Sequence, residues 1–246
     1  MIPLRDSNPT RTFPAVTLGL IVLNVVVFLL DRLTAVRHAV DVVTPVGVIR
    51  TYESVGGLSS GFSMIPVDVV HTSGGWLTIF TSMFLHANLL HIGGNMLYLW
   101  IFGNNVEDSL GKIRFLLFYL AVGAAGAGVH VLTNPQSDVP TIGASGAVAG
   151  VMGAYLVLFP NARILALVPI FIVSTLMEVP AVLVIGFWAV LQFLNMNWLG
   201  GGELRGGGVA YGAHVGGFVA GIVLIMLLGG RNLVDRRYSR RYDPDW

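Results

Sequence analysis

The sequence contains no cysteine among its 246 residues. This absence excludes disulfide bonds, zinc sites built from thiolates and a cysteine nucleophile. It leaves the compartment open, because a chain without cysteine suits either side of a membrane. Three common uses of cysteine are thus removed at once.

Charged residues are also scarce, at 11% of the chain, while 54% of the residues are hydrophobic. Soluble domains carry about 25% charged residues. A soluble protein of this size could not bury so much apolar surface, so we expect a lipid bilayer as the solvent. The net charge of +1 gives no reason to expect nucleic acid as a partner.

The apolar residues fall into runs of membrane-spanning length, for which about 20 residues suffice. The first run exceeds a signal-peptide core and has no clear small-residue cleavage site, so it is interpreted as a retained helix. The runs predict an all-α polytopic membrane protein with six transmembrane helices, in a domain over 14–230 between a short N-terminal tail (1–13) and a basic C-terminal tail (231–246). The predicted spans are 14–33, 82–104, 113–132, 142–159, 180–198 and 209–229.

Two further segments test this count. Residues 34–80 are too polar to span, and their amphipathic pieces suit a loop at the membrane interface. The apolar stretch 164–179 is short, contains Pro169 and ends beside Pro180. It is interpreted as re-entrant or interfacial. If it spanned instead, a seven-helix protein would result and the last helix would reverse.

Basic residues indicate the orientation, because cytoplasmic loops carry an excess of Lys and Arg. With six spans both termini lie in the cytoplasm, and the compact core suggests a bacterial plasma membrane. The basic residues that then face the cytoplasm are Arg5, Arg11, Lys112, Arg114, Arg163, Arg231, Arg236, Arg237, Arg240 and Arg241.

The second predicted span contains the first polar cluster, His86, His91 and Asn95. Ionisable groups inside a span are functional candidates. His91 and Asn95 are four residues apart and share a helix face. Hydrogen bonding between helices is the alternative interpretation. A zinc site is less well supported, because the face has no HExxH pattern and no acidic ligand.

Ser145 begins the fourth span between Gly143 and Gly146. The glycines alone could mark a helix-packing seam with an incidental serine. The functional interpretation is a nucleophile beside a helix N-terminus, where free N–H groups can stabilise an oxyanion.

His214 lies in the last span, with no carboxylate near it and with Gly217 and Gly221 after it. It could simply bond to a neighbouring helix, or it could be the general base for Ser145. Ser145 lies about three residues into its helix and His214 about five, so at about 1.5 Å per residue their depths differ by only a few Å. With six spans both meet in the outer half of the bilayer, together with the first polar cluster.

Four motifs occur in order over about 75–229. They are HANLLHIGGN, NNVEDSLG with Glu107 and Gly111, GASG around Ser145, and AHVGGFVAG around His214. Together they resemble the rhomboid family of intramembrane serine proteases, whose fold is a bundle of six transmembrane helices.

The resemblance implies a Ser145–His214 dyad that cleaves single-pass transmembrane proteins near the outer side of the bilayer. It implies an oxyanion hole from the Ser145 N–H, His91 and Asn95, a gate formed by the fifth helix and the loop 199–210, and neither metal nor organic cofactor. The residues expected to give structural support are His86, Glu107, Gly143, Gly146, Gly217 and Gly221.

Two departures from the family pattern concern neighbours of these groups. Some members have an aromatic residue four after the serine, beneath the catalytic histidine, where this chain has Ala149. Some have Trp-Arg at the base of the first loop, where Trp76 here lacks an adjacent arginine. A catalytically silent rhomboid-like protein that binds membrane clients is the alternative function. A proton-coupled transporter would spread polar residues across the bilayer and carry an acidic relay.

Overall fold

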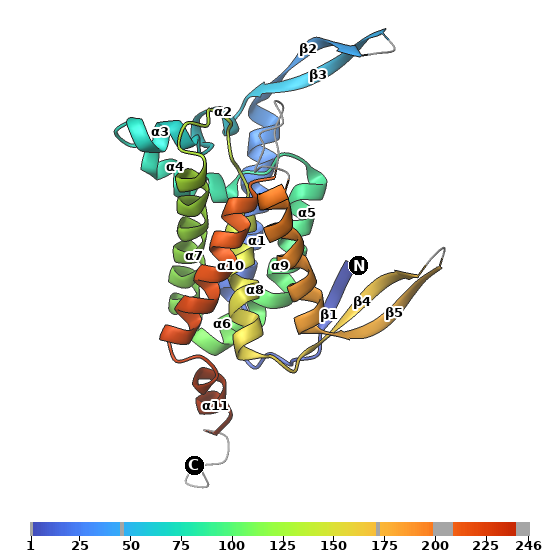
Figure 1. The fold of residues 1–246 in the computed structure, drawn as a ribbon, viewed down its shortest axis with the longest axis vertical. Helices are drawn as coiled ribbons and strands as arrows, with labels where there is room; N and C mark the ends of the chain where they lie inside the picture. The colour runs from blue at the N-terminus through green and yellow to red at the C-terminus, as the bar shows by residue number, and fades with distance from the viewer. Residues whose placement is uncertain (1, 45–46, 171–172, 199–208, 240–246) are drawn as a thin grey trace.

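The computed structural model describes residues 2–44, 47–170, 173–198 and 209–239 (Figure 1). Long helices run side by side and form the body of the molecule. The chain follows one helical path through α5, η3 and α6. The main helices are α1 (Ala15–Thr34), α5 (Leu89–Tyr98), η3 (Leu99–Gly103), α6 (Asn104–Leu110), α7 (Lys112–Thr133), α8 (Ser145–Leu158), α9 (Ala181–Trp198) and α10 (Tyr211–Leu227).

Short helices fill the connection between α1 and α5, and one more follows α10. α3 and α4 pack against α7 near one end of the bundle. These helices are α2 (Ser59–Phe62), α3 (Pro66–His71), η1 (Gly75–Leu77), α4 (Thr78–Thr81), η2 (Ser82–Phe84) and α11 (Asn232–Ser239).

Five of the six predicted spans coincide with helices of the structure to within a few residues. The second, predicted over 82–104, overlaps the helical path Leu89–Leu110, which begins and ends several residues later. Within the described residues, α1 and α7 are the two helices long and apolar enough to cross a membrane by length and composition alone. Shorter apolar helices include Ser145–Leu158, Ala181–Met196 and Tyr211–Leu227. The number of crossings therefore stays a prediction.

The expectation of an all-α protein is wrong in two places. β2 (Ala35–Thr44) and β3 (Gly47–Gly56) form an antiparallel hairpin that extends beyond α1 (Figure 1). β1 (Ile2–Asp6), β4 (Arg163–Ile170) and β5 (Val173–Pro180) form an antiparallel sheet in the order β1-β4-β5. These segments contain many β-branched residues, which suit strands better than helices.

The sheet also corrects the interpretation of 164–179. This stretch is a β-hairpin at the end of the bundle where α8 ends, and its described residues form neither a re-entrant nor a spanning helix. The described residues of this stretch therefore supply no seventh helix, and their interfacial position stays a prediction.

Glycines allow α8 and α10 to pack closely, as their spacing predicts. A Cβ at Gly217 would overlap the carbonyl oxygen of Gly146, and one at Gly221 would overlap that of Gly150. Small residues at such crossings let two backbones approach. This contact fixes how the first turns of α8 and α10 face each other.

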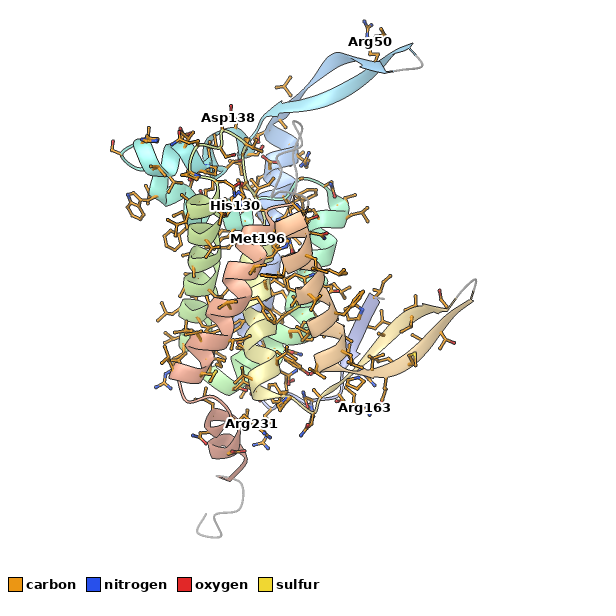
Figure 2. The ribbon with its side chains drawn as sticks, viewed as in Figure 1. Arg50, His130, Asp138, Arg163, Met196 and Arg231 are labelled. Atoms are coloured by element: carbon orange, nitrogen blue, oxygen red, sulfur yellow. The ribbon has the colours of Figure 1, made fainter. Side chains whose placement is uncertain are left out.

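Polar groups tie the N-terminal segment to the end of the bundle away from β2 and β3. Figure 2 labels Arg163 and Arg231 at this end and Arg50 and Asp138 at the other. The Asp6 carboxylate accepts hydrogen bonds from Tyr155 Oη on α8 (2.8 Å) and Asn105 Nδ2 on α6 (2.7 Å). The first strand is thus joined to the helices by side chains as well as by β4.

Glu107 holds the start of α1. This buried carboxylate accepts hydrogen bonds from the N–H groups of Val16 (3.0 Å) and Thr17 (2.7 Å) and from the Thr17 hydroxyl (2.7 Å). The N-cap residue, Pro14, supplies no side-chain cap. Glu107 therefore caps α1 from α6, where a negative charge is favoured.

Candidate active site

Ser145 is the first residue of α8 and lines a cavity of about 870 Å³. The turn before it depends on Gly143, whose φ of 127° disfavours other residues and whose N–H donates to the Ser82 carbonyl (2.9 Å). The first N–H groups of a helix have no partner within the helix. The turn thus presents a hydroxyl and free amide donors to one cavity.

His214 lies in the first turn of α10 and lines the same cavity as Ser145. A Cβ at Gly146, next to Ser145, would lie 3.3 Å from the carbonyl oxygen of Ala213, next to His214. The α8–α10 contact therefore brings the two predicted catalytic residues to one place. The Ser145 hydroxyl makes no hydrogen bond within the described part of the chain, so the structure does not contain the Ser145–His214 bond that the dyad would use.

The ring of His214 instead contacts α9. Its Nδ1 lies 2.8 Å from Gln192 Oε1. An amide oxygen can only accept, so Nδ1 carries the proton and Nε2 keeps its lone pair. The Trp188 ring lies beside the imidazole, with centroids 5.8 Å apart and planes at 34°, and Tyr211 approaches it edge-on at 6.4 Å.

His91 and Asn95 lie on α5 and also line the cavity. The N–H of Ala87 donates to His91 Nδ1 (3.4 Å), so Nε2 carries the proton of the neutral ring. This Nε2 faces the turn before Ser145, because a Cβ at Gly143 would lie 2.8 Å from it and 3.6 Å from Ser145 Oγ. Two donors therefore reach the cavity, since Asn95 Nδ2 is buried and has no partner within the described residues.

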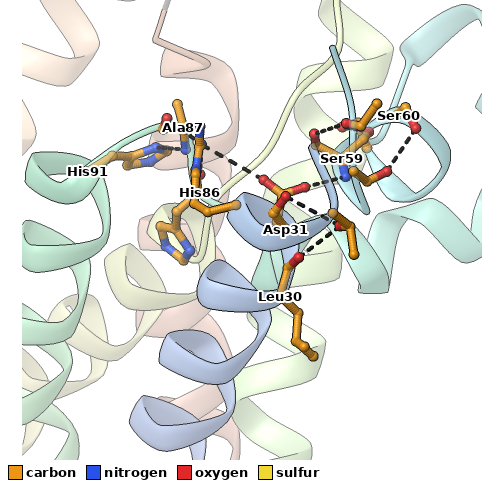
Figure 3. A network of polar contacts seen from close by, with 12 residues as sticks. Leu30, Asp31, Ser59, Ser60, His86, Ala87 and His91 are labelled. Carbon is orange, nitrogen blue, oxygen red and sulfur yellow. Dashed lines mark hydrogen bonds and ion pairs between the residues drawn. The ribbon is translucent and has the colours of Figure 1, made fainter. Parts of the chain in front are cut away.

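The chain before His91 is held by α1, as Figure 3 shows. Arg32 Nη2 donates to the carbonyls of His86 (3.0 Å) and Ala87 (2.6 Å) and lies 3.8 Å from Asp31 Oδ2. Asp31 in turn accepts from the N–H of Ser59 (2.7 Å). This arginine supplies an anchor for the first loop, although none follows Trp76 in the sequence.

The residues predicted to give structural support lie in several parts of the molecule. His86 is buried beside His91, with ring centroids 5.0 Å apart in an edge-on arrangement. Gly143 shapes the turn before Ser145, and the other glycines lie in the α8–α10 contact. Glu107 lies at the start of α1, outside the cavity lining. Most of the predicted gate loop, 199–210, lies outside the described residues.

Sequence reasoning missed Gln192, Trp188 and His130. Gln192 is an amide within the apolar run of α9, which is a recognisable signal. Trp188 precedes it by one helical turn. His130 on α7 lies 3.2 Å from the Thr141 hydroxyl, in the segment that leads to Ser145.

The geometry of the site and the order of the motifs agree with a match to a known protein family. The family model for the Rhomboid domain matches residues 73–231, which include all four predicted catalytic and oxyanion residues. The chain belongs to the rhomboid family. A helical polytopic fold and integral membrane location follow from membership.

Relatives of this rhomboid chain come from several kinds of cell. Over 153 residues it is 35% identical to the mitochondrial Rhomboid protein 1 of Saccharomyces cerevisiae, covering 60% of this chain and 40% of the yeast protein. It is 41% identical over 83 residues to the rhomboid protease GluP of Bacillus subtilis, covering 34% of this chain and 16% of GluP. It is 40% identical over 91 residues to the putative rhomboid protease YdcA of the same organism, covering 36% and 45%. The matches thus span less than half the length of each of these relatives.

Proposed function

We propose that this chain is an intramembrane serine endopeptidase that cleaves single-pass membrane proteins near the outer side of the bilayer. One observation carries the proposal. Ser145, His214, His91 and Asn95 come from three separate helices and line a single cavity. Two relatives whose names call them rhomboid proteases add support from similarity.

The chemistry assigned to Ser145 and His214 is acyl transfer. Ser145 Oγ attacks the carbonyl carbon of the scissile peptide while His214 Nε2 accepts the hydroxyl proton. His214 then gives this proton to the leaving amine nitrogen as the C–N bond breaks. A water molecule, deprotonated by His214, hydrolyses the acyl-enzyme and restores the Ser145 hydroxyl.

The oxyanion is assigned to the Ser145 N–H, His91 Nε2–H and Asn95 Nδ2. A buried amide without a partner is rare in folded proteins. Asn95 Nδ2 is such a group within the described residues, on a side chain that lines the same cavity as Ser145. Preorganised donors of this kind contribute about 10²–10³ in rate each. Asn95→Ala should therefore lower kcat by at least about tenfold.

The test is cleavage of a purified single-pass substrate in detergent by wild type, Ser145→Ala and His214→Ala. Wild type should cleave, and both variants should lose more than about 10³ in rate. Equal cleavage by all three proteins would exclude Ser145 and His214 as the catalytic pair. Absence of cleavage by wild type, with retained capture of the same substrate, would favour a client-binding protein instead.

We also propose six crossings with both termini in the cytoplasm of a bacterial cell. The proposal is supported by the helices that coincide with the six apolar runs and by the distribution of basic residues. Because the chain has no cysteine, single cysteines report location cleanly. Ser60→Cys should react with an impermeant maleimide on intact cells, and Asn161→Cys only after permeabilisation. The reverse pattern would contradict the topology.

A further inference from the structure

The contact between α9 and α10 contains one hydrogen bond in apolar surroundings. Gln192 Oε1 accepts from His214 Nδ1 at 2.8 Å. Beside this pair lies a cavity of about 260 Å³, lined mainly by apolar and aromatic side chains such as Trp188, Phe193 and Phe218. Within the described residues, His214 is the only hydrogen-bond partner of the Gln192 side chain.

A polar side chain in such a setting needs a reason, because an unpaired amide among apolar groups is unfavourable. Many acceptors and donors on the neighbouring helix could satisfy such an amide. This one bonds to a ring nitrogen of the proposed general base, on the side away from its reacting nitrogen. The bond fixes the ring tautomer, which leaves Nε2 free to accept a proton.

We propose that Gln192 is a positioning residue for His214, assisted by Trp188, and that α9 must be docked on α10 for the base to be oriented. The inference rests on the proposed Ser145–His214 chemistry. It assigns to α9 the task that a carboxylate performs in serine protease triads, namely to hold the imidazole in one tautomer and orientation.

The position of Trp188 strengthens this assignment. Ala149 lies one turn after Ser145 and has no ring to support the imidazole. Trp188 lies one turn before Gln192 on α9, and its ring faces His214 with centroids 5.8 Å apart. One face of α9 therefore supplies both the hydrogen bond and the aromatic contact to His214.

This arrangement couples helix docking to catalysis. The opposite side of α9 is exposed, including Phe187 at 63% and Leu183 at 59% of their accessible surface. α10 packs more extensively on α7 and α8 than on α9. A displacement of α9 would remove Gln192 and Trp188 from His214 while the α8–α10 contact stays in place. The nucleophile and base would then remain adjacent but lose the orientation of the imidazole.

The test compares Gln192→Leu with Gln192→Glu, which keeps an acceptor, and with Phe187→Leu, which places leucine on the exposed side of α9. Cleavage of the single-pass substrate gives kcat and KM, and a fluorophosphonate gives the labelling rate of Ser145. Gln192→Leu should lower kcat and the labelling rate about tenfold, as expected for one lost orienting bond, with KM within about twofold. Gln192→Glu and Phe187→Leu should stay within about threefold of wild type.

The ring tautomer supplies a readout that a structural role would not move. ¹⁵N NMR of His214 in the protein without substrate should show the Nδ1–H form in wild type and a mixture in Gln192→Leu. Gln192→Met, which keeps the side-chain length without a strong acceptor, should match Gln192→Leu in all readouts. Having two variants keeps the test valid if one of them does not fold.

Failure of the positioning role and failure of the protease proposal give different results. If Ser145→Ala and His214→Ala are inactive but Gln192→Leu and Gln192→Met keep wild-type kcat, labelling rate and tautomer, the positioning role is overturned and the protease proposal stands. If Ser145→Ala or His214→Ala cleaves like wild type, the protease proposal itself fails. Equal losses in Gln192→Glu and Gln192→Leu, at unchanged thermal stability, would also overturn the positioning role.

Discussion

Replacement of Glu107 by alanine should strongly destabilise the membrane domain, because this carboxylate caps α1 from another helix. It accepts three hydrogen bonds, two from backbone N–H groups in the first turn of α1 and one from the Thr17 hydroxyl. The hydroxyl can rotate to another acceptor, whereas the two N–H groups are fixed. Each buried donor left without a partner costs about 1–3 kcal/mol. The Thr17 N–H is buried and the Val16 N–H is only partly buried, so the second donor counts at about 1 kcal/mol and we expect a loss of about 2–4 kcal/mol.

The assay is thermal unfolding of the purified protein in detergent. For a chain of this size about 1 kcal/mol shifts Tm by roughly 2–4 °C, so Glu107→Ala should lower Tm by about 5–15 °C. Glu178 is a matched control, since its side chain is 61% exposed and pairs with Arg163 at 3.3 Å. Exposed ion pairs contribute little, so Glu178→Ala should change Tm by less than about 2 °C. Similar changes in both variants would refute the capping argument.

Two further predictions concern packing and pH. Gly221→Ala should lower Tm by about 2–12 °C, because its Cβ would overlap the Gly150 carbonyl oxygen and such overpacking costs about 1–3 kcal/mol. Gly93→Ala, where a Cβ meets nothing within 4 Å, should not lower Tm, and equal losses in both variants would contradict the packing role. Burial raises the pKa of Asp6 above 3.8, against the opposing effect of the Tyr155 hydrogen bond, so the folded state binds this proton more tightly than the unfolded state and loses stability as pH rises through the window above 3.8. The Tm of Asp6→Asn minus that of wild type should therefore be larger at pH 7 than near pH 4, and a difference independent of pH would refute this.

The helices could be predicted from the sequence because a bilayer requires long apolar runs, which leave a strong signal. The stretches Ala15–Thr34 and Lys112–Thr133 were found almost to the residue. The strands were missed because 164–179 was judged by apolarity and length. Its β-branched residues favour a strand, and Pro169 disfavours a helix. The pairing partner at residues 2–6 is a long-range feature that no local pattern reveals.

In the candidate site, too, local sequence signals could be predicted and long-range contacts could not. Ser145, His214, His91 and Asn95 were found because polar residues in apolar runs stand out and because their motifs occur in order. Their shared cavity depends on glycine contacts that the sequence spacing indicated. The pairing of Gln192 with His214 could not be predicted, since the rotation of α9 about its own axis decides which of its side chains faces α10.

The three-stranded sheet has a consequence for membrane insertion. The strands of a small open sheet are expected to lie on one side of a bilayer, because the sheet edges would leave backbone groups unpaired in hydrocarbon. β1 pairs with β4 from Asp6 opposite Ile164, so this pairing requires an even number of crossings between these residues, as in the proposed topology. The bridge between Met64 and Thr141 imposes the same condition on its own interval. A chain with one helix left uninserted inside either interval could not form that pairing. The two pairings together therefore form only when the number of inserted helices in each interval is even.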